Sequence, residues 1–461
     1  MIKINKFKKY NFGEFAIVLS TLPIVTNFLL TFREEIKYQI LKYFFLALPL
    51  TILLFLFFLM IGIAIKEIFE LKTISFAIAA SFGTIFMFNN IFLFLTANID
   101  FRILVYCYLF LLFLLFLFKL EKPKNYFIVF LSIILIFLIN LLSNQGLFFD
   151  QHLELFTSDE ARLWFPTTQS IYEQNYLIAL QSSSIEGYGV YSAYIKSFIS
   201  IISSYNNLYV YNPSTSNLFL IFFFLMIYEI EANRKIKLTL SVLFFSIFFT
   251  NNWINYLFFN SLLGEGPAGF IFGATIFEIT KSEKKIPIYL LLFLSFNVYG
   301  KNFLTVLTVL LIIYACLKYK KLFYLMIGIF PILISLINAS LYEVGYLWQF
   351  YFSDSNTQRN NDFWSPLNFL EMIKQFYVDK TLTIVFIVII ALYVLSKQKL
   401  KKLFLNEYLG ETIFFVNIIV VFVVYIFLVE ELEAIQDSYR YLITTLYLLP
   451  LTLAKFTENN D

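Results

Sequence analysis

Long apolar runs constrain this chain more than any other feature of its sequence. Segments of roughly 15 to 25 apolar residues, enough to cross about 30 Å of hydrocarbon, recur from one end to the other. Hydrophobic residues make up 60% of the 461 positions and charged residues only 14%, well below the roughly one quarter expected of soluble domains. The composition therefore predicts an all-α polytopic membrane protein.

The apolar runs predict about fourteen spans, a total accurate to about two. Those before the first long polar segment lie near 13–32, 43–65, 74–98, 103–118 and 126–143. Those after it lie near 215–231, 236–252, 266–280, 286–299, 303–317, 322–341, 381–397, 411–430 and 440–455. The predicted parts of the chain are residues 1–143 with N-terminal spans, an extracytoplasmic loop 144–214, central spans in 215–341, a second extracytoplasmic loop 342–380, and C-terminal spans in 381–461.

Charge predicts the orientation of these spans. With both termini in the cytoplasm, the cytoplasmic segments hold 23 of the 34 lysines and arginines, as the positive-inside rule requires. The basic start runs into a full-length span without a small-residue cleavage site, so it is predicted to be an anchor. The alternation of cytoplasmic and outer loops requires that segment 187–207 does not cross the membrane. With Lys196 at its middle, it is predicted to be an interfacial helix on the outer side.

The outer loop contains the polar stretch "FTSDEARLWFPTTQSIYEQN", residues 156–175. A helix cap explains part of it, because Asp159 and Glu160 would lie in a first helical turn, where the helix dipole favours acids. Arg162 lies one turn from Asp159, and Pro166 can end this helix and begin another. A cap and a functional carboxylate are both open interpretations at this point.

Several kinds of site have no support in the sequence. His152 is the single histidine, which excludes a multi-histidine metal site, and no Ser/His/Asp set is expected with His152 alone. Cys107 and Cys316 lie in apolar runs, where a thiol fills space more often than it forms a disulfide. No Gly-rich phosphate loop follows a strand, and the basic residues follow the topology, so neither nucleotide nor nucleic-acid binding is expected.

Motifs along residues 145–455 occur in the order found in a known family. They are Asp159 with Trp164 five residues later in a "D-a-x-x-x-W" pattern, "GYGVYSAYIKSFIS" with Tyr188, "LLGEGPAGFIFGATI" with Glu265, "NVYGKNFLTVLTVLLIIY" with Lys301, and "SYRYLITTLYLLP" with Tyr439 and Arg440. Together they resemble bacterial glycosyltransferases of the GT-C superfamily. The chain departs from the family in three ways: Glu265 replaces an aspartate, Asn302 and Phe303 replace Glu and Gly, and five spans precede the loop.

The resemblance implies a GT-C-like fold with extracytoplasmic interfacial helices, in a bacterial-type inner membrane. It implies transfer of a sugar, with inversion, from a polyprenyl-phosphate donor to a glycan, lipid or protein acceptor at the outer face. Asp159 would be the base, with Glu160 as the alternative. Glu265 would share the acceptor, or hold a divalent cation such as Mg²⁺ or Mn²⁺ together with Asp159. No other cofactor is implied.

Arg440 and Lys301 are the predicted phosphate ligands, since cations at an apolar edge need anions and a guanidinium matches phosphate with two donors. Arg162, Trp164, Tyr188 and Tyr439 complete the predicted substrate-binding set. Arg440 and Lys301 could equally be anchors beside an aromatic belt.

Two other functions stay open. A surface-polysaccharide polymerase or ligase would be expected to use outer arginines and a histidine, of which the chain has few. A lipid or sugar transporter or flippase should carry charged residues at mid-span depth, whereas this chain keeps nearly all its charge near span ends.

Overall fold

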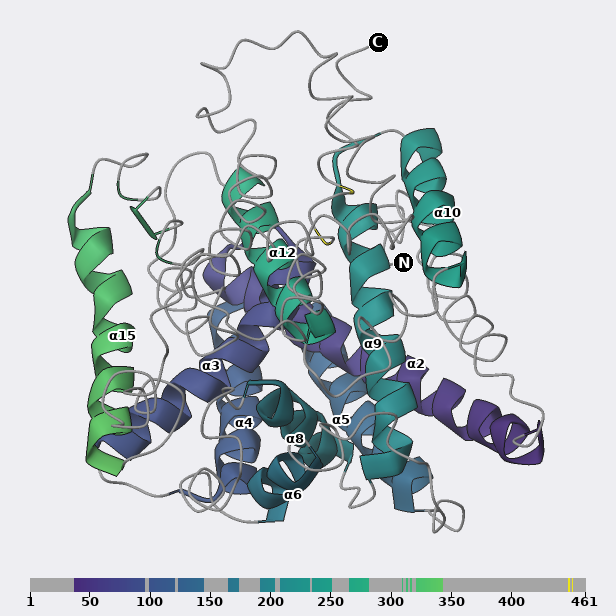
Figure 1. Cartoon of the computed structure of the whole chain (residues 1–461), viewed down its shortest axis with the longest axis horizontal. Helices are drawn as coiled ribbons and strands as arrows, with labels where there is room; N and C mark the ends of the chain where they lie inside the picture. The colour runs from purple at the N-terminus through teal and green to yellow at the C-terminus, as the bar shows by residue number, and fades with distance from the viewer. Residues whose placement is uncertain are drawn as a thin grey trace, which may run out of the picture.

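The fold is known for part of the chain. The computed structural model describes residues 37–95, 99–120, 123–144, 165–173, 191–203, 208–232, 234–250, 265–281, 309, 312–313, 316, 321–342, 447 and 450. Within these ranges every element of regular secondary structure longer than a single residue is an α-helix, as Figure 1 shows. The helices are α2 (Lys37–Phe69), α3 (Ile74–Phe94), α4 (Phe101–Leu120), α5 (Pro123–Asn144), α6 (Phe165–Glu173), α8 (Tyr191–Ser203), α9 (Leu208–Glu229), α10 (Arg234–Thr250), α12 (Glu265–Lys281) and α15 (Phe323–Tyr342).

Four of these helices are long and apolar enough to cross a membrane. The spanning stretches are Pro49–Phe69 in α2, Ile74–Phe94 in α3, Phe101–Lys119 in α4 and Lys124–Leu141 in α5. They confirm long apolar helices at the predicted spans that begin near residues 43, 74, 103 and 126. The predicted spans 13–32, 286–299, 381–397 and 411–430 lie outside the described residues, as do most of 303–317 and 440–455. The total of about fourteen therefore stays a prediction.

Helix α3 lies inside the bundle and packs against α2, α12, α15 and α9. Its sequence, "ISFAIAASFGTIFMFNNIFLF", is rich in alanine, serine, glycine and asparagine, and most of these small or polar side chains are buried. Small residues let helix backbones approach closely in a membrane, where apolar burial alone gives little preference for protein over lipid. Gly62 of α2 makes one such approach, because a Cβ there would lie 2.8 Å from Ile78 Cγ1 of α3.

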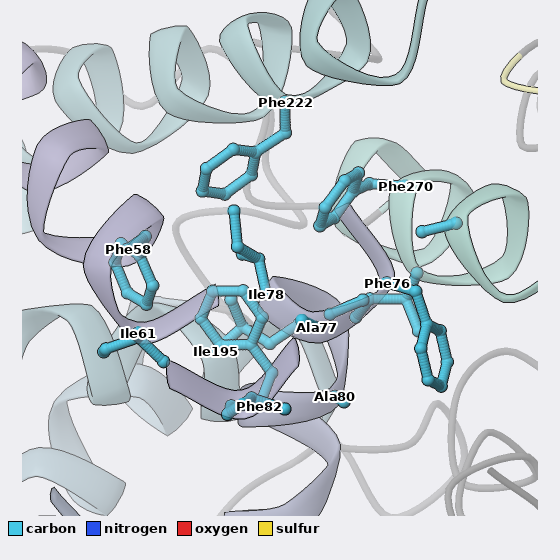
Figure 2. Packing of buried hydrophobic residues seen from close by; sticks show 14 of the residues in the cluster. Phe58, Ile61, Phe76, Ala77, Ile78, Ala80, Phe82, Ile195, Phe222 and Phe270 are labelled. Atoms are coloured by element: carbon cyan, nitrogen blue, oxygen red, sulfur yellow. The ribbon is translucent and has the colours of Figure 1, made fainter. Parts of the chain in front are cut away.

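Phenylalanine rings fill the centre of the described bundle, as Figure 2 shows. The ring centroid of Phe58 on α2 lies 5.1 Å from that of Phe82 on α3 and 6.0 Å from that of Phe222 on α9. Phe222 stacks at 4.9 Å on Phe270 of α12. Phe198 of α8 meets Phe82 edge to face at 5.5 Å. These rings join five helices in one core, and tilted and edge-to-face pairs of this kind add to simple burial.

Helices α4 and α5 present a broad apolar face to the outside. Phe110 and Phe118 of α4 and Phe127 and Phe130 of α5 are all largely exposed. An exposed aromatic surface of this size would be a liability in water. It is the surface expected of helices that contact lipid.

The turn between α2 and α3 is short. The amide of Leu71 donates to Lys66 O at 3.0 Å, which closes the end of α2 in the manner of a Schellman motif. Glu70 occupies the left-handed position of this turn with φ 56°, where glycine is usual. α3 begins at Ile74, four residues after Glu70, so α2 and α3 form a close antiparallel pair.

Helices α6 and α8 pack on each other within the segment predicted to be the first outer loop. α6 begins at Phe165, so Pro166 lies in its first turn, as the sequence predicted. α8 has 13 residues, roughly 20 Å, fewer than a bilayer span requires, and the prediction that segment 187–207 does not span also covers flanking residues outside the described ones.

The surroundings of α8 differ from the sequence expectation. An interfacial helix should show a polar face to water, yet each described side chain from Tyr194 to Ile202 is buried, and Lys196 is only 1% exposed. Serine hydroxyls allow this burial, because Ser197 Oγ donates to Thr168 O at 2.8 Å and Ser200 Oγ donates to Lys196 O at 2.9 Å. The polar stripe of α8 is thus covered by other helices.

Candidate functional site

Two glutamates from different helices hold the N-terminus of α3. Glu278 of α12 accepts hydrogen bonds from Lys72 N through Oε1 and from Thr73 N through Oε2, both at 2.8 Å. Thr73 Oγ1 also donates to Oε2, at 2.7 Å. Glu278 is 1% exposed, so these hydrogen bonds are made away from water. Thr73 is the N-cap residue of α3, but its hydroxyl binds Glu278 and makes no cap of its own.

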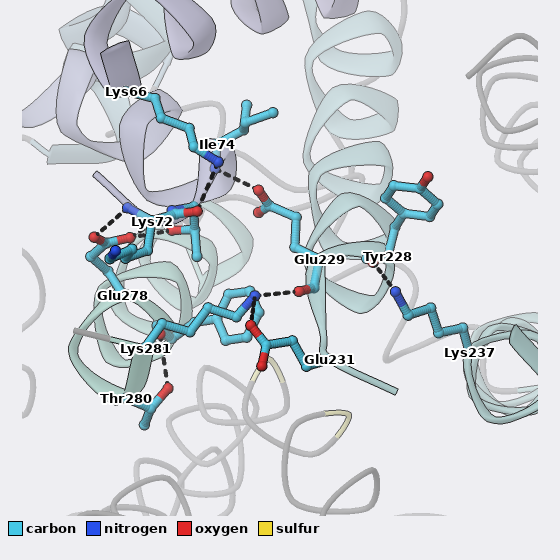
Figure 3. Close-up of polar contacts among 12 residues, drawn as sticks. Lys66, Lys72, Ile74, Tyr228, Glu229, Glu231, Lys237, Glu278, Thr280 and Lys281 are labelled. Atoms are coloured by element: carbon cyan, nitrogen blue, oxygen red, sulfur yellow. Dashed lines mark hydrogen bonds and ion pairs between the residues drawn. The ribbon is translucent and has the colours of Figure 1, made fainter. Parts of the chain in front are cut away.

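Glu229, the last residue of α9, completes the arrangement in Figure 3. Its Oε1 accepts from Ile74 N at 2.5 Å and its Oε2 accepts from Ser75 N at 3.0 Å. Four consecutive backbone amides, 72 to 75, therefore donate to two carboxylates. We call Glu229, Glu278 and these four amides the glutamate clamp. A helix N-terminus has unpaired N–H groups and a partial positive charge, and the clamp satisfies both with anions.

Lysines surround the clamp, and two of them, Lys281 and Lys237, bind carbonyls at the C-terminal end of α9. Lys281 Nζ of α12 donates to Glu229 O at 2.6 Å and lies 3.5 Å from a carboxylate oxygen of Glu231. Lys66 Nζ of α2 donates to Lys72 O at 2.8 Å. Lys237 Nζ of α10 donates to Tyr228 O at 2.7 Å. Cations are favoured at the C-terminal ends of helices, because the last carbonyls there are unpaired and the dipole is negative.

The same end of the bundle includes α4 and α5. Lys119 Nζ of α4 donates to Ile68 O of α2, and Lys124 Nζ of α5 lies 3.2 Å from Glu67 Oε1. The C-terminal ends of α2, α4, α9 and α12 and the N-terminal ends of α3, α5 and α10 thus lie together. We call this the basic end of the described bundle.

The opposite end is held by uncharged donors and one arginine. Asn338 Nδ2 of α15 donates to Asn90 O at 2.9 Å, and Tyr342 Oη donates to Leu93 O at 2.8 Å. These two side chains, four residues apart on α15, pair carbonyls of the last turn of α3. α3 is consequently held at both ends by side chains from other helices.

Helix α6 is docked at this opposite end. Arg102, at the start of α4, donates from Nε to Tyr172 O at 2.9 Å, and its guanidinium carbon lies 4.8 Å from the centroid of the Tyr172 ring. The Tyr172 carbonyl belongs to the last turn of α6, where a cation is favoured by the helix dipole. With the bond from Ser197 to Thr168 O, α6 is attached to both α4 and α8.

The predicted site residues are described only in part. Asp159, Glu160, Arg162, Trp164, Tyr188, Lys301, Tyr439 and Arg440 lie outside the described residues. Glu265 begins α12, and Glu278 at the clamp lies 13 residues later, so the backbone of Glu265 lies about 20 Å along the helix from the clamp. In sequence, Trp164 directly precedes α6. The catalytic and substrate-binding assignments therefore stay predictions.

Sequence reasoning missed both glutamates of the clamp. Each lies in the last turn of an apolar helix, within "LFLIFFFLMIYE" and "FIFGATIFEITK". An acid in that position is opposed by the dipole of its own helix, which is a signal that another group compensates for it. Because Glu229 and Glu278 each bind two consecutive amides, the clamp is a structural junction of α3, α9 and α12.

No group of three or more His, Cys, Asp or Glu residues that could hold a metal ion occurs in the described part of the chain. The predicted Mg²⁺ or Mn²⁺ position between Asp159 and Glu265 depends on side chains outside that part. Comparison with known proteins finds no match to any family model, curated protein or solved structure.

Proposed function

We propose that the protein is a membrane glycosyltransferase that moves a sugar from a polyprenyl phosphate to an acceptor at the extracytoplasmic face. The main support is the acid-rich segment "SDEARLW", which leads directly into α6. α6 is docked at the end of the bundle away from the lysines, and Glu265, the first residue of α12, lies about 20 Å along that helix from Glu278 at the basic end. The two predicted acidic elements are thus expected on one side of the membrane.

Charge supports the proposed orientation. The basic end holds Lys66, Lys119, Lys124, Lys237 and Lys281, which by the positive-inside rule should face the cytoplasm. α6 and the N-terminus of α12 would then face the outer side, where a lipid-linked donor would be used. Both chain termini are proposed to be cytoplasmic.

The proposed reaction is a single displacement. The acceptor oxygen or nitrogen attacks the anomeric carbon of the sugar, the bond from this carbon to the phosphate oxygen breaks, and the polyprenyl phosphate leaves with the electron pair. The proton of the nucleophile passes to the Asp159 carboxylate. Arg440 and Lys301 take up the charge that develops on the phosphate. Glu265 orients the acceptor.

Charge placement in the four membrane-length helices favours this proposal over transport. Their charged residues lie in the end turns: Lys66 and Glu67 in α2, Arg102 and Lys119 in α4, and Lys124 in α5. The α3 span contains none. Carriers commonly place charged or helix-breaking residues at mid-membrane depth.

The proposal is tested by the rate of sugar transfer from polyprenyl-phosphate sugars supplied to the purified protein in lipid nanodiscs. Asp159→Asn preserves a good helix cap but cannot accept a proton, so we expect transfer to fall by about a hundredfold to ten-thousandfold. Glu160→Gln is the matched control and should have a smaller effect. Binding of polyprenyl phosphate should survive Asp159→Asn and weaken in Arg440→Ala by about 1.5 to 3 kcal/mol. An Asp159→Asn protein that keeps most of its transfer rate would falsify the assignment of this base.

A further inference from the structure

The cations of the basic end differ in whether their side chains form hydrogen bonds or ion pairs with other protein groups. Lys66, Lys119, Lys237 and Lys281 donate to carbonyls, and Lys124 pairs with Glu67. Within the described part of the chain, the Arg234 and Lys235 side chains are exposed and have neither a hydrogen bond nor an ion pair. They are consecutive, at the start of α10. Lys72 is also exposed without a side-chain hydrogen bond or ion pair among the described residues, but it lies alone in the turn between α2 and α3, whereas Arg234 and Lys235 place two such charges next to each other.

An exposed apolar surface continues from these two charges along α10. Leu238 and Val242 follow Arg234 at four-residue intervals, and Leu243 follows Lys235 by eight residues, so each row begins with a cation. Leu238, Val242 and Leu243 are 65%, 57% and 43% exposed. The rows extend about 12 Å along the helix axis. We call these five residues the outer face of α10.

The inner face of the same helix is fixed to α9. Lys237 reaches the carbonyl and the ring of Tyr228, with Nζ 5.1 Å from the ring centroid, and Phe244 meets Phe223 edge to face at 5.2 Å. Leu240 is buried between them along the helix. Among the described helices α10 packs mainly on α9, and Figure 1 shows it at the margin of the bundle. Its outer face is therefore held in a defined orientation.

We infer that the outer face of α10 binds an anionic phospholipid. Its phosphate would lie against Arg234 and Lys235, and an acyl chain would lie along Leu238, Val242 and Leu243. Juxtamembrane cations attract anionic headgroups by about 1 kcal/mol each, and among the described residues no carboxylate or carbonyl is bonded to these two side chains. A soluble phosphate would use the two charges but leave the apolar rows without an occupant. The inference does not depend on the proposed transferase activity.

The face of α4 and α5 provides an internal comparison. It is equally apolar and exposed, with Phe118 adjacent to Lys119 at the basic end. There, however, Lys119 binds Ile68 O and Lys124 pairs with Glu67. Because these cations already have protein partners, lipids beside Phe118 should be selected much more weakly than lipids beside Leu238.

Selectivity at each position can be measured with a fluorophore that brominated lipids quench. In a Cys107→Ala/Cys316→Ala background, a bimane probe is attached through Leu238→Cys or, as the matched position, Phe118→Cys. The full chain is reconstituted in phosphatidylcholine vesicles that contain brominated phosphatidylglycerol or brominated phosphatidylcholine at equal mole fraction. The relative binding of the two lipids beside each probe follows from the two quenching curves.

We expect the probe at Leu238→Cys to prefer phosphatidylglycerol by about tenfold or more, since each cation contributes about fivefold. The probe at Phe118→Cys should show a ratio near one. Arg234→Gln/Lys235→Gln should bring the ratio at Leu238→Cys close to one. Lys72→Gln/Lys124→Gln removes the same charge from the same end and should leave that ratio in place.

Three results would overturn the inference. The first is an equal ratio at the two probe positions, and the second is a ratio that survives Arg234→Gln/Lys235→Gln. The third is loss of the preference in inorganic phosphate but not in potassium chloride of equal ionic strength, which would indicate a soluble phosphate site. If the double variant does not fold, about 0.5 M potassium chloride applied to the parent decides, because screening must then reduce the ratio.

Discussion

Removing one carboxylate from the glutamate clamp should destabilise the whole bundle. In Glu278→Gln the side chain keeps one oxygen, and its NH₂ group then faces a backbone or hydroxyl donor that has no other partner in the clamp. A buried unpaired donor costs about 1 to 3 kcal/mol, and the lost anion at a helix N-terminus costs about 0.3 to 1 kcal/mol more. We expect the free energy of unfolding to fall by about 2 to 4 kcal/mol.

Glu278→Gln should loosen the amides of the clamp and, through them, lower the stability of the whole bundle. The free energy of unfolding is measured by titration with SDS in mixed micelles, followed by far-UV circular dichroism. Hydrogen exchange in a peptide that covers the amides of Lys72–Ser75 reports the local change, and these amides should exchange faster. Glu231→Gln is the matched control. Glu231 also lies at the basic end, where its carboxylate is 3.5 Å from Lys281 Nζ. Because the Glu231 side chain is 88% exposed, water screens this ion pair, and its loss should cost no more than about 0.5 kcal/mol.

A double variant tests whether Glu229 and Glu278 hold α3 together as one junction or act as two independent helix caps. Glu229 and Glu278 bind adjacent pairs of amides on one helical turn, so loss of either carboxylate should loosen the turn that the other holds. Glu229→Gln/Glu278→Gln should therefore cost less than the sum of the single changes, by about 0.5 to 3 kcal/mol. The reasoning is refuted if Glu278→Gln unfolds like Glu231→Gln and the exchange of the four amides is unchanged.

Three further changes test the packing and turns of α3 by the same titration. Gly62→Ala should cost about 1 to 3 kcal/mol, since its Cβ would lie 2.8 Å from Ile78 Cγ1, and combining it with Ile78→Ala, which removes Cγ1, should cost less than the sum of the two single changes. Glu70→Gly should stabilise the protein by about 1 to 2 kcal/mol, because it relieves a left-handed residue at φ 56°, and a destabilised variant would contradict this. Asn338→Leu removes the Nδ2 donor to the Asn90 carbonyl, a hydrogen bond worth about 0.5 to 1.5 kcal/mol, and an unchanged titration would show that this bond contributes nothing.

The sequence predicted the individual helices well, because each apolar run is bounded by charged or turn-forming residues. The predicted span 322–341 is α15 at Phe323–Tyr342, and 266–280 is α12 at Glu265–Lys281. Helix α2 is the exception in length, since it starts at Lys37 whereas its predicted span starts near residue 43. Hydropathy reports only the part that crosses the apolar layer and says nothing about polar extensions of the same helix.

The order of packing could not be predicted from hydropathy, because nearly every helix is apolar on all sides. α3 becomes the central helix through its small and polar residues, such as Ser81, Gly83 and Asn90, which are buried. α4 and α5 instead have many large side chains that face outward. Composition within a span is therefore the signal for burial that a count of apolar residues overlooks.

The polar junctions were hidden for a different reason. A count of charges in loops overlooks both acids, because the predicted spans 215–231 and 266–280 contain Glu229 and Glu278 near their ends. Their role appears only when α9 and α12 deliver them to the same turn of α3, from positions 155 and 206 residues away in the chain from the first amide that each binds. Contacts of such long sequence separation depend on the packing of the whole bundle and have no local pattern.

The contact of Glu278 with α3 also affects the position of Glu265, a residue of the proposed transferase site. Glu278 fixes one end of α12 against α3, and Glu265 begins the same helix 13 residues earlier, about 20 Å away along its axis. A straight helix anchored at one end transmits a small change of angle to its other end as a larger displacement. Release of Glu278 should therefore alter the position of Glu265 and slow transfer even where substrate binding elsewhere is intact. Such a variant would lose turnover without losing affinity for polyprenyl phosphate, whereas a purely local cap would leave both unchanged in the molecules that stay folded.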